Sequence, residues 1–148
     1  MKLFTIGFTK KPASTFFDLL KNNNVKTVID IRLNNYSQLA GFAKGNDLKY
    51  FLKEICNIDY THNIDLAPTK EILDNYKTKK IIWSEYVDQF TDLLENRYMA
   101  EYISKNISEF ENACLLCSEL KPDKCHRSLV AEYIKKSYQE SNFEIKHL

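Results

Sequence analysis

Residues 113–134 read ACLLCSELKPDKCHRSLVAEYI, and this stretch decides the fold. The first five residues are all apolar, which is typical of a strand that is buried on both faces of a sheet. A short polar loop follows the strand. The apolar residues that then recur at helical spacing are Leu129, Val130, Tyr133 and Ile134. A buried strand followed by an amphipathic helix is the repeating unit of a parallel sheet that helices cover.

The rest of the chain alternates in the same way. Apolar or β-branched runs predict further strands at residues 3–8 and 25–31, we expect another at 58–63, and alternation of apolar and polar residues predicts a final strand at 143–148. The helices predicted between the strands begin near the possible cap residues Ser14, Asn46, Thr69 and Ser84 and near Met99. A loop over residues 33–45 follows the second strand. We therefore predict a single α/β domain over residues 1–148, a three-layer αβα sandwich with a mostly parallel sheet of about five strands.

The composition fits one globular domain without long flexible segments. The 148 residues are 44% hydrophobic and 28% charged, and they include only three glycines and three prolines. So few glycines exclude a Walker A loop and a GxGxxG motif. The formal net charge of +1 is much lower than that of most proteins that coat nucleic acid, so nucleic acid is not the favoured partner.

The cysteines and the apolar runs indicate the compartment. The four cysteines are too sparse for a disulfide scaffold in a chain of this length. The first residues lack the apolar core of a signal peptide, and no run is long enough to span a membrane. We therefore expect a cytoplasmic protein with free thiols and no membrane partner. No feature of the sequence predicts its oligomeric state.

Polar residues follow the predicted strands where they end. In such a sheet ligands bind outside the carboxyl ends of the strands. Gly7 ends the first strand, where a glycine admits either a ligand or a closely packed backbone. Asp30 and Arg32 end the second strand and point to the same face, as binding groups or as a structural ion pair. His62 ends the third strand, as a ligand contact or as a satisfied buried histidine.

The fourth strand is followed by the densest group of polar residues. Cys117 and Glu119 reach the edge of the sheet, and the segment Cys125–Ser128 begins the next helix. The free N–H groups and the dipole of a helix start attract anions. At that place the Cys125 thiol is expected to have a lowered pKa and to be nucleophilic.

Arginine usage points to the same edge. The chain has 18 lysines and only three arginines, which are Arg32, Arg97 and Arg127. Two of the three fall at the predicted site, and a guanidinium offers carboxylate or phosphate a bidentate fork that lysine lacks. We therefore expect Arg127 to bind an anion. In the alternative, Asp123 caps the helix and Arg127 pairs with the side chain of Glu119 or Asp30.

The spacing of the cysteines gives no indication of a bound metal or cofactor. Cys114 and Cys117 have an odd spacing on one strand and point to opposite faces, which argues against a redox pair and against a shared zinc. A zinc site formed by Cys117, Cys125 and His126 does not match common ligand spacings. We therefore expect no bound metal.

Six short segments together form a specific pattern. They are Thr5-Ile6-Gly7, Asp30-Ile31-Arg32, Leu66-Ala67-Pro68-Thr69, Leu115-Leu116-Cys117-Ser118-Glu119, Cys125-His126-Arg127-Ser128 and His147-Leu148. In these segments the chain resembles the domain-of-unknown-function 488 (DUF488) family over essentially its whole length. The resemblance implies an αβα fold and a shared site at the strand edge, and it implies no particular reaction.

The residues predict an anion-binding site for a phosphate-bearing small molecule or a nucleotide. The expected substrate-binding residues are Gly7, Arg32, His62, Cys117, Arg127 and Ser128. The candidate catalytic residues are Asp30, Glu119, Cys125 and His126, as acid, base or nucleophile. The sequence leaves open whether the protein is an enzyme. The alternative is a nucleic-acid-associated or protein-interaction module without catalysis.

Overall fold

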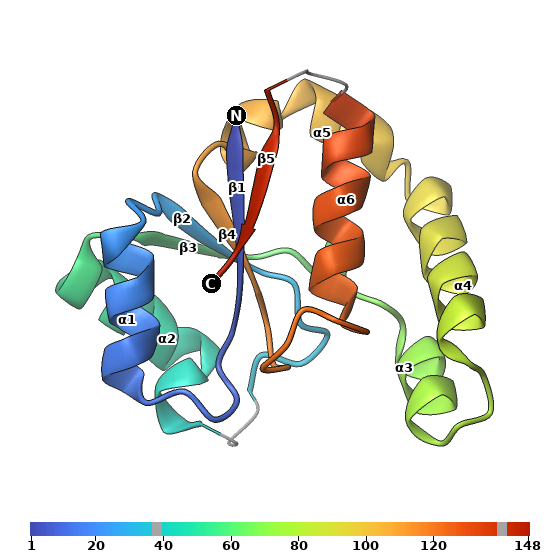
Figure 1. Ribbon diagram of the computed structural model, residues 1–148, viewed down its shortest axis with the longest axis horizontal. Coiled ribbons are helices and arrows are strands. Elements are labelled where there is room, and N and C mark those ends of the chain that lie inside the picture. Colours follow the sequence, from blue (N-terminus) through green and yellow to red (C-terminus); the bar gives the residue numbers. More distant parts are fainter. Residues whose placement is uncertain (37–39, 139–141) are drawn as a thin grey trace.

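A computed structural model of the chain describes residues 1–36, 40–138 and 142–148. Within these residues five strands, all parallel, form one sheet in the order β3-β2-β4-β1-β5 (Figure 1). The strands are β1 (Lys2–Gly7), β2 (Thr27–Asp30), β3 (Asp59–His62), β4 (Ala113–Cys117) and β5 (Glu144–His147). The predicted α/β fold, with a parallel sheet of five strands, is confirmed.

Helices cover both faces of this sheet. The α-helices of the described residues are α1 (Ala13–Asn22), α2 (Gly45–Phe51), α3 (Lys70–Lys77), α4 (Trp83–Asn96), α5 (Met99–Lys105) and α6 (His126–Tyr138). The segment Leu52–Cys56 extends α2 as a π-helical turn. Helices α1 and α2 pack on one face, and α3 to α6 lie on the other, so the fold has three layers (Figure 1). None of the described helices is long and apolar enough to cross a membrane.

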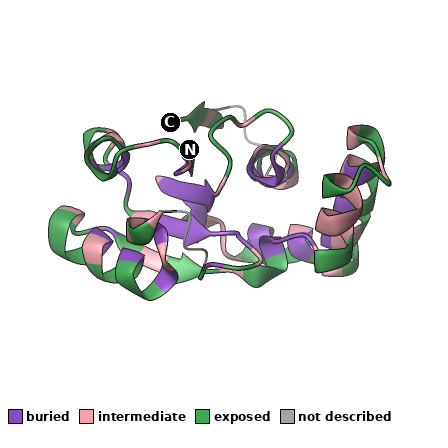
Figure 2. Cartoon of the chain, turned by 90° about the horizontal axis from the view of Figure 1, so that it is seen from below, coloured by how far each residue is buried: buried purple, intermediate pink, exposed green. Residues whose placement is uncertain are grey.

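Strand β4 lies in the middle of the core, and every one of its residues is buried (Figure 2). Leu115 packs with Val130 and the other apolar residues of the face that α6 covers. Cys114 belongs to the apolar cluster on the opposite face, together with Phe16 of α1. Cys117 contacts His126 of α6. Cys114 and Cys117 therefore point to opposite faces, as their spacing predicts.

The helix starts agree only in part with the predicted caps. Thr69 caps α3, because its Oγ1 accepts the backbone N–H of Ile72 at 3.2 Å. Ser14, Asn46 and Ser84 do not cap their helices, because each helix begins one residue before them. Pro12 stands at the N-cap of α1, where its fixed φ suits a helix entry. Residues 37–39 of the predicted loop after β2 lie outside the described residues.

The strand order makes β1 and β4 a topological switch point of the sheet. Strand β1 leads into α1 on one face, and its neighbour β4 leads into α6 on the other face. Neighbouring strands whose helices diverge in this way leave room for a ligand at their carboxyl ends. Gly7 and Cys117 are register partners there, and Asp30 of β2 lies opposite Leu116 on the other side of β4. Four adjacent strands thus carry predicted site residues at this edge, because His62 ends β3, the neighbour of β2.

Candidate functional site

Asp30 and Arg32 form a buried ion pair just beyond β2. The Arg32 Nε donates to Asp30 Oδ1 at 2.8 Å, and its Nη2 donates to Oδ2 at 2.6 Å. Nη2 also donates to the Ala43 carbonyl at 2.8 Å, which ties the loop after β2 to this pair. Although burial works against the charged form, the hydrogen bond with Asp30 raises the pKa of Arg32. The charge of Arg32 is therefore neutralised within the protein.

Two residues of β3 hold this ion pair in place. The Tyr60 hydroxyl donates to Asp30 Oδ2 at 2.7 Å, and burial together with the Asp30 charge raises the pKa of Tyr60. The His62 Nε2 donates to the Arg32 carbonyl at 2.8 Å. Asp30 is fully buried, and the backbone N–H of Arg32 also donates to its Oδ1. Four donors thus enclose one carboxylate, whose geometry suits holding Arg32 rather than transferring protons.

The side chains of Cys117, Cys125 and His126 converge at the end of β4 and the start of α6. Their two sulfurs and one ring nitrogen all lie within 4.8 Å of one another, and all three residues are buried. Cys117 Sγ and His126 Nδ1 are 3.5 Å apart. The His126 Nε2 donates to the Ile31 carbonyl at 2.8 Å, so the neutral ring presents the Nδ1 lone pair to the sulfurs. Burial lowers the pKa of His126, which favours this neutral form.

The two thiols have different acidities. A hydrogen bond from the Cys125 thiol lowers the pKa of Cys117, and the backbone N–H groups of Ser118 and Glu119 add to this effect. The neighbouring Cys117 sulfur and burial raise the pKa of Cys125. The expectation of a lowered Cys125 pKa is therefore wrong, because the second sulfur and the loss of water outweigh the helix start.

Arg127 is the largest fully buried side chain among the described residues, and none of their carboxylates pairs with it. Its Nη1 donates to the Glu119 carbonyl and lies 3.8 Å from Cys125 Sγ, and its Nη2 donates to the Leu120 carbonyl at 3.2 Å. Its Nε has no hydrogen-bond partner. Carbonyl groups satisfy N–H donors, but they do not neutralise a charge. The predicted alternative, a pair with the Glu119 or Asp30 carboxylate, is not found.

Two more basic side chains lie near Arg127. Burial and the charge of Arg127 together lower the pKa of Lys11 and that of His147. The Lys11 side chain makes no hydrogen bond or ion pair with any described residue, whereas His147 Nδ1 lies 2.7 Å from the Thr5 hydroxyl. Gly7 lies against the same group: an added Cβ would be 1.7 Å from the Glu119 carbonyl oxygen and 2.7 Å from Arg127 Nη1. A side chain at position 7 does not fit.

A family model described as "Domain of unknown function DUF488" matches residues 12–134. The chain belongs to the DUF488 family. The DUF488 match includes Asp30, Arg32, Cys117 and the segment Cys125–Arg127, whereas Gly7 lies outside it, as do Lys11 and His147. Comparisons with curated proteins and with solved structures each found no match. Membership in DUF488 is thus established, while the function has to be argued from the geometry.

The structure brings most of the predicted site residues of this DUF488 domain to one edge. The residues that meet there directly or through one shared neighbour are Gly7, Asp30, Arg32, Cys117, Cys125, His126 and Arg127. Glu119 takes part through its carbonyl while its side chain is exposed. Ser128 fastens the loop, because its hydroxyl donates to the carbonyls of Pro122 and Cys125. His62 reaches only the Arg32 backbone.

Sequence reasoning missed three residues of this DUF488 site. His147 lies at the carboxyl end of β5, so the same strand-end rule applied to the last strand would have found it. Tyr60 is two residues before His62 on β3 and shares its face, which is a usable signal. Lys11 carries no such signal, because it is one of 18 lysines in a loop.

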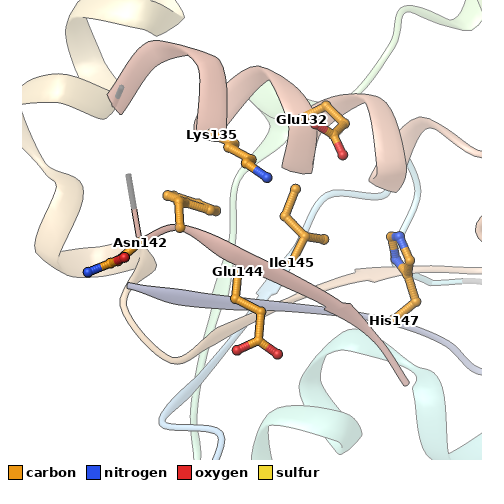
Figure 3. A pocket seen from close by; sticks show the side chains of 7 residues that line it. Glu132, Lys135, Asn142, Glu144, Ile145 and His147 are labelled. Carbon is orange, nitrogen blue, oxygen red and sulfur yellow. The ribbon is translucent and has the colours of Figure 1, made fainter. Parts of the chain in front are cut away.

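Two open cavities lie beside this edge. One, of about 560 Å³, runs between α6 and β5, and its lining includes Glu132, Lys135, Ile145 and His147 (Figure 3). The other, of about 550 Å³, lies at the end of β3. Its lining includes His62, Asp65, Arg97, Tyr102 and Glu109. Neither cavity is lined by Arg127 or Cys117, and the side chains of both residues are buried.

Proposed function

We propose that this DUF488 chain binds a small phosphate-bearing molecule beside Arg127, at the carboxyl edge of β1 and β4. The observation that carries the proposal is the wholly buried Arg127 guanidinium, which no carboxylate of the described residues neutralises. An unpaired buried charge costs several kcal/mol of stability. An anion beside the guanidinium removes this cost, and the planar fork of N–H groups suits a phosphate.

The two arginines at this edge, Arg32 and Arg127, differ in whether a carboxylate of the protein already neutralises their positive charge. Arg32 already has Asp30 as its partner, through two side-chain hydrogen bonds. Arg127 has two carbonyls and lies near the two thiols, so its positive charge is available to an outside ligand. Lys11 and His147 add basic groups from other elements, and burial together with the unneutralised charge of Arg127 lowers the pKa of each.

The ligand has to reach a covered side chain. The carbonyls that hold Arg127 belong to Glu119 and Leu120, in the loop between β4 and α6. A phosphate therefore replaces these carbonyls as the partner of the guanidinium, and the loop shifts outward to admit it. Lys11 is half-buried and has no other partner, so it is free to close over the bound anion. The proposal concerns binding and assigns no reaction.

Thermal unfolding in sodium phosphate, compared with sodium chloride of equal ionic strength, tests this proposal. A ligand at a hundredfold excess over its Kd stabilises the folded state by about 2.7 kcal/mol, which for a chain of this size raises the Tm by roughly 5–11 °C. AMP and a single-stranded oligonucleotide are measured in parallel. A rise with phosphate and AMP supports the proposal, whereas a rise with the oligonucleotide alone favours the nucleic-acid module.

Three variants localise the effect. Lys11→Gln removes a charge near Arg127 without breaking any hydrogen bond, so we expect the phosphate-induced rise to fall. Lys26→Gln is the matched control, because Lys26 is exposed and precedes β2 at the opposite edge of the sheet. Arg127→Lys keeps the charge and loses the fork, and it should lose most of the rise. No phosphate-specific rise in the unsubstituted protein, or equal losses in Lys11→Gln and Lys26→Gln, would refute the proposal.

A further inference from the structure

We propose that Cys117, Cys125 and His126 together bind one zinc ion, with the fourth coordination position left to water or an anion. The proposal does not depend on the anion site, because it concerns a different set of side chains. The sequence spacing argued against a metal, since no common zinc motif places its ligands in this way. The fold removes this objection, because the end of β4 and the start of α6 bring the three donor atoms together.

The distances suit a tetrahedral ion. In a zinc site with Zn–S of about 2.3 Å and Zn–N of about 2.05 Å, tetrahedral angles separate sulfur and nitrogen by about 3.6 Å. Cys117 Sγ and His126 Nδ1 are 3.5 Å apart, and Cys125 Sγ lies within 4.8 Å of both. The pair Cys117 and His126 therefore needs almost no movement to accept the ion, and Cys125 Sγ needs a shift of at most about 1.2 Å. Two cysteines and one histidine with an open fourth position are a known zinc ligand set.

The surroundings of the three ligands also fit a metal site. A histidine ligand usually donates its other ring N–H to a carbonyl or a carboxylate, which fixes the ring. His126 does so toward the Ile31 carbonyl at 2.8 Å, and its Nδ1 is then free to coordinate. Arg127 Nη1 lies 3.8 Å from the Cys125 sulfur, and a positive charge at this place stabilises a thiolate.

The charges and the donor atoms favour zinc over other common ions. Two thiolates and one Zn²⁺ make a neutral unit, so binding adds no net charge beside the buried guanidinium of Arg127, and two protons are released. Sulfur ligands exclude magnesium and calcium, which prefer oxygen. The other two cysteines lie apart from this group: Cys114 is on the opposite face of β4, and Cys56 ends the turn after α2.

Metal analysis of the protein purified without chelator tests the zinc proposal. We expect one zinc per chain, and one tetrahedral cobalt with thiolate-to-metal charge-transfer absorption after cobalt is substituted for zinc. Cys117→Ser and Cys125→Ser should each lower the zinc content to near zero, and Cys56→Ser is the matched control that should keep it. Circular dichroism verifies that each variant is folded. The cobalt spectrum of the unsubstituted protein provides a test even if a variant fails to fold.

Three results would overturn the proposal. The first is a zinc content well below one per chain together with no charge-transfer band on titration of the reduced protein with cobalt. The second is zinc that folded Cys117→Ser and Cys125→Ser both retain, which would place the ion elsewhere. The third is a Cys117–Cys125 disulfide in protein that was purified under reducing conditions. Each is distinguishable from failure of the anion proposal, because phosphate binding is read from the Tm and not from metal content.

Discussion

Replacing Asp30 by asparagine tests whether the ion pair at the end of β2 is closed to solvent. The substitution keeps the size of the side chain and removes the negative charge that faces Arg32. It also replaces one accepting oxygen by a nitrogen that does not accept. Because Oδ1 receives two N–H groups of Arg32 and Oδ2 receives Nη2 and the Tyr60 hydroxyl, at least one buried donor loses its partner.

The burial of both partners sets the size of the effect. Asp30 is 0% and Arg32 is 3% exposed, so neither gains water when the pair is broken. Removal of one partner from a buried ion pair typically destabilises a protein by about 3–5 kcal/mol. In a chain of this size 1 kcal/mol shifts the Tm by roughly 2–4 °C, so we expect Asp30→Asn to lower it by roughly 6–20 °C.

Asp59→Asn is the matched control for this experiment. Asp59 pairs with Lys53 at 3.0 Å, but both side chains are more than half exposed. Such pairs contribute at most about 1 kcal/mol, so the control should lower the Tm by less than about 4 °C. Urea unfolding of the two variants and the unsubstituted protein gives the free energies directly. If Asp30→Asn lowers the free energy of unfolding no more than Asp59→Asn does, water or a bound anion reaches Arg32, and our description of this pair is wrong.

Three further predictions concern other parts of the edge. Gly7→Ala should destabilise the protein by about 1–3 kcal/mol or more in urea unfolding because its Cβ meets the chain between β4 and α6, whereas Gly41→Ala, with nothing within 4 Å, should change little. A similar effect of both would contradict the packing. Above about pH 10 the Tyr60 phenol ionises in the unfolded chain, whereas its raised pKa keeps it protonated in the folded protein, so the folded state loses stability as the pH rises. Tyr60→Phe removes this phenol and should make that loss of stability smaller. Unfolding at about pH 8 and 11 measures this, and an unchanged loss argues against burial of that hydroxyl. Phosphate should raise the pKa of His147, which Arg127 helps to lower, and an NMR titration in which the pKa stays constant would argue against an anion at this place.

Strands β1, β2 and β4 could be predicted because they are short apolar or β-branched runs, and β5 could be predicted because its residues alternate between apolar and polar. The all-apolar run at residues 113–117 coincides with β4, the most buried strand. The helix caps were less predictable. Ser14 and Asn46 are of residue types that often cap helices, but α1 and α2 begin after Pro12 and Lys44 instead. Local sequence therefore predicts the elements, and tertiary packing decides their first residues.

The rule that ligands bind outside the carboxyl ends of parallel strands predicts where the site lies, but it does not predict the contacts between the residues of the site. That Arg127 would bind carbonyls depends on the path of the loop after Cys117, which no local pattern encodes. The acidity of Cys125 depends in the same way on a sulfur eight residues away. His147 ends a strand that the sequence predicts, but the pairing of this strand with β1 is a long-range contact that no local pattern encodes.

The order of strands in the sheet has a consequence for how the protein is made. Strands β1 and β2 are each paired with β4 and not with one another, although more than eighty residues separate β2 from β4 along the chain. On the ribosome, the two amino-terminal strands therefore emerge long before the strand that joins them. The edges that these strands present to β4 stay unpaired during this interval and are open to unwanted association. The nascent chain becomes one sheet only after residues 113–117 have left the exit tunnel, so folding of this domain is a late event of its synthesis.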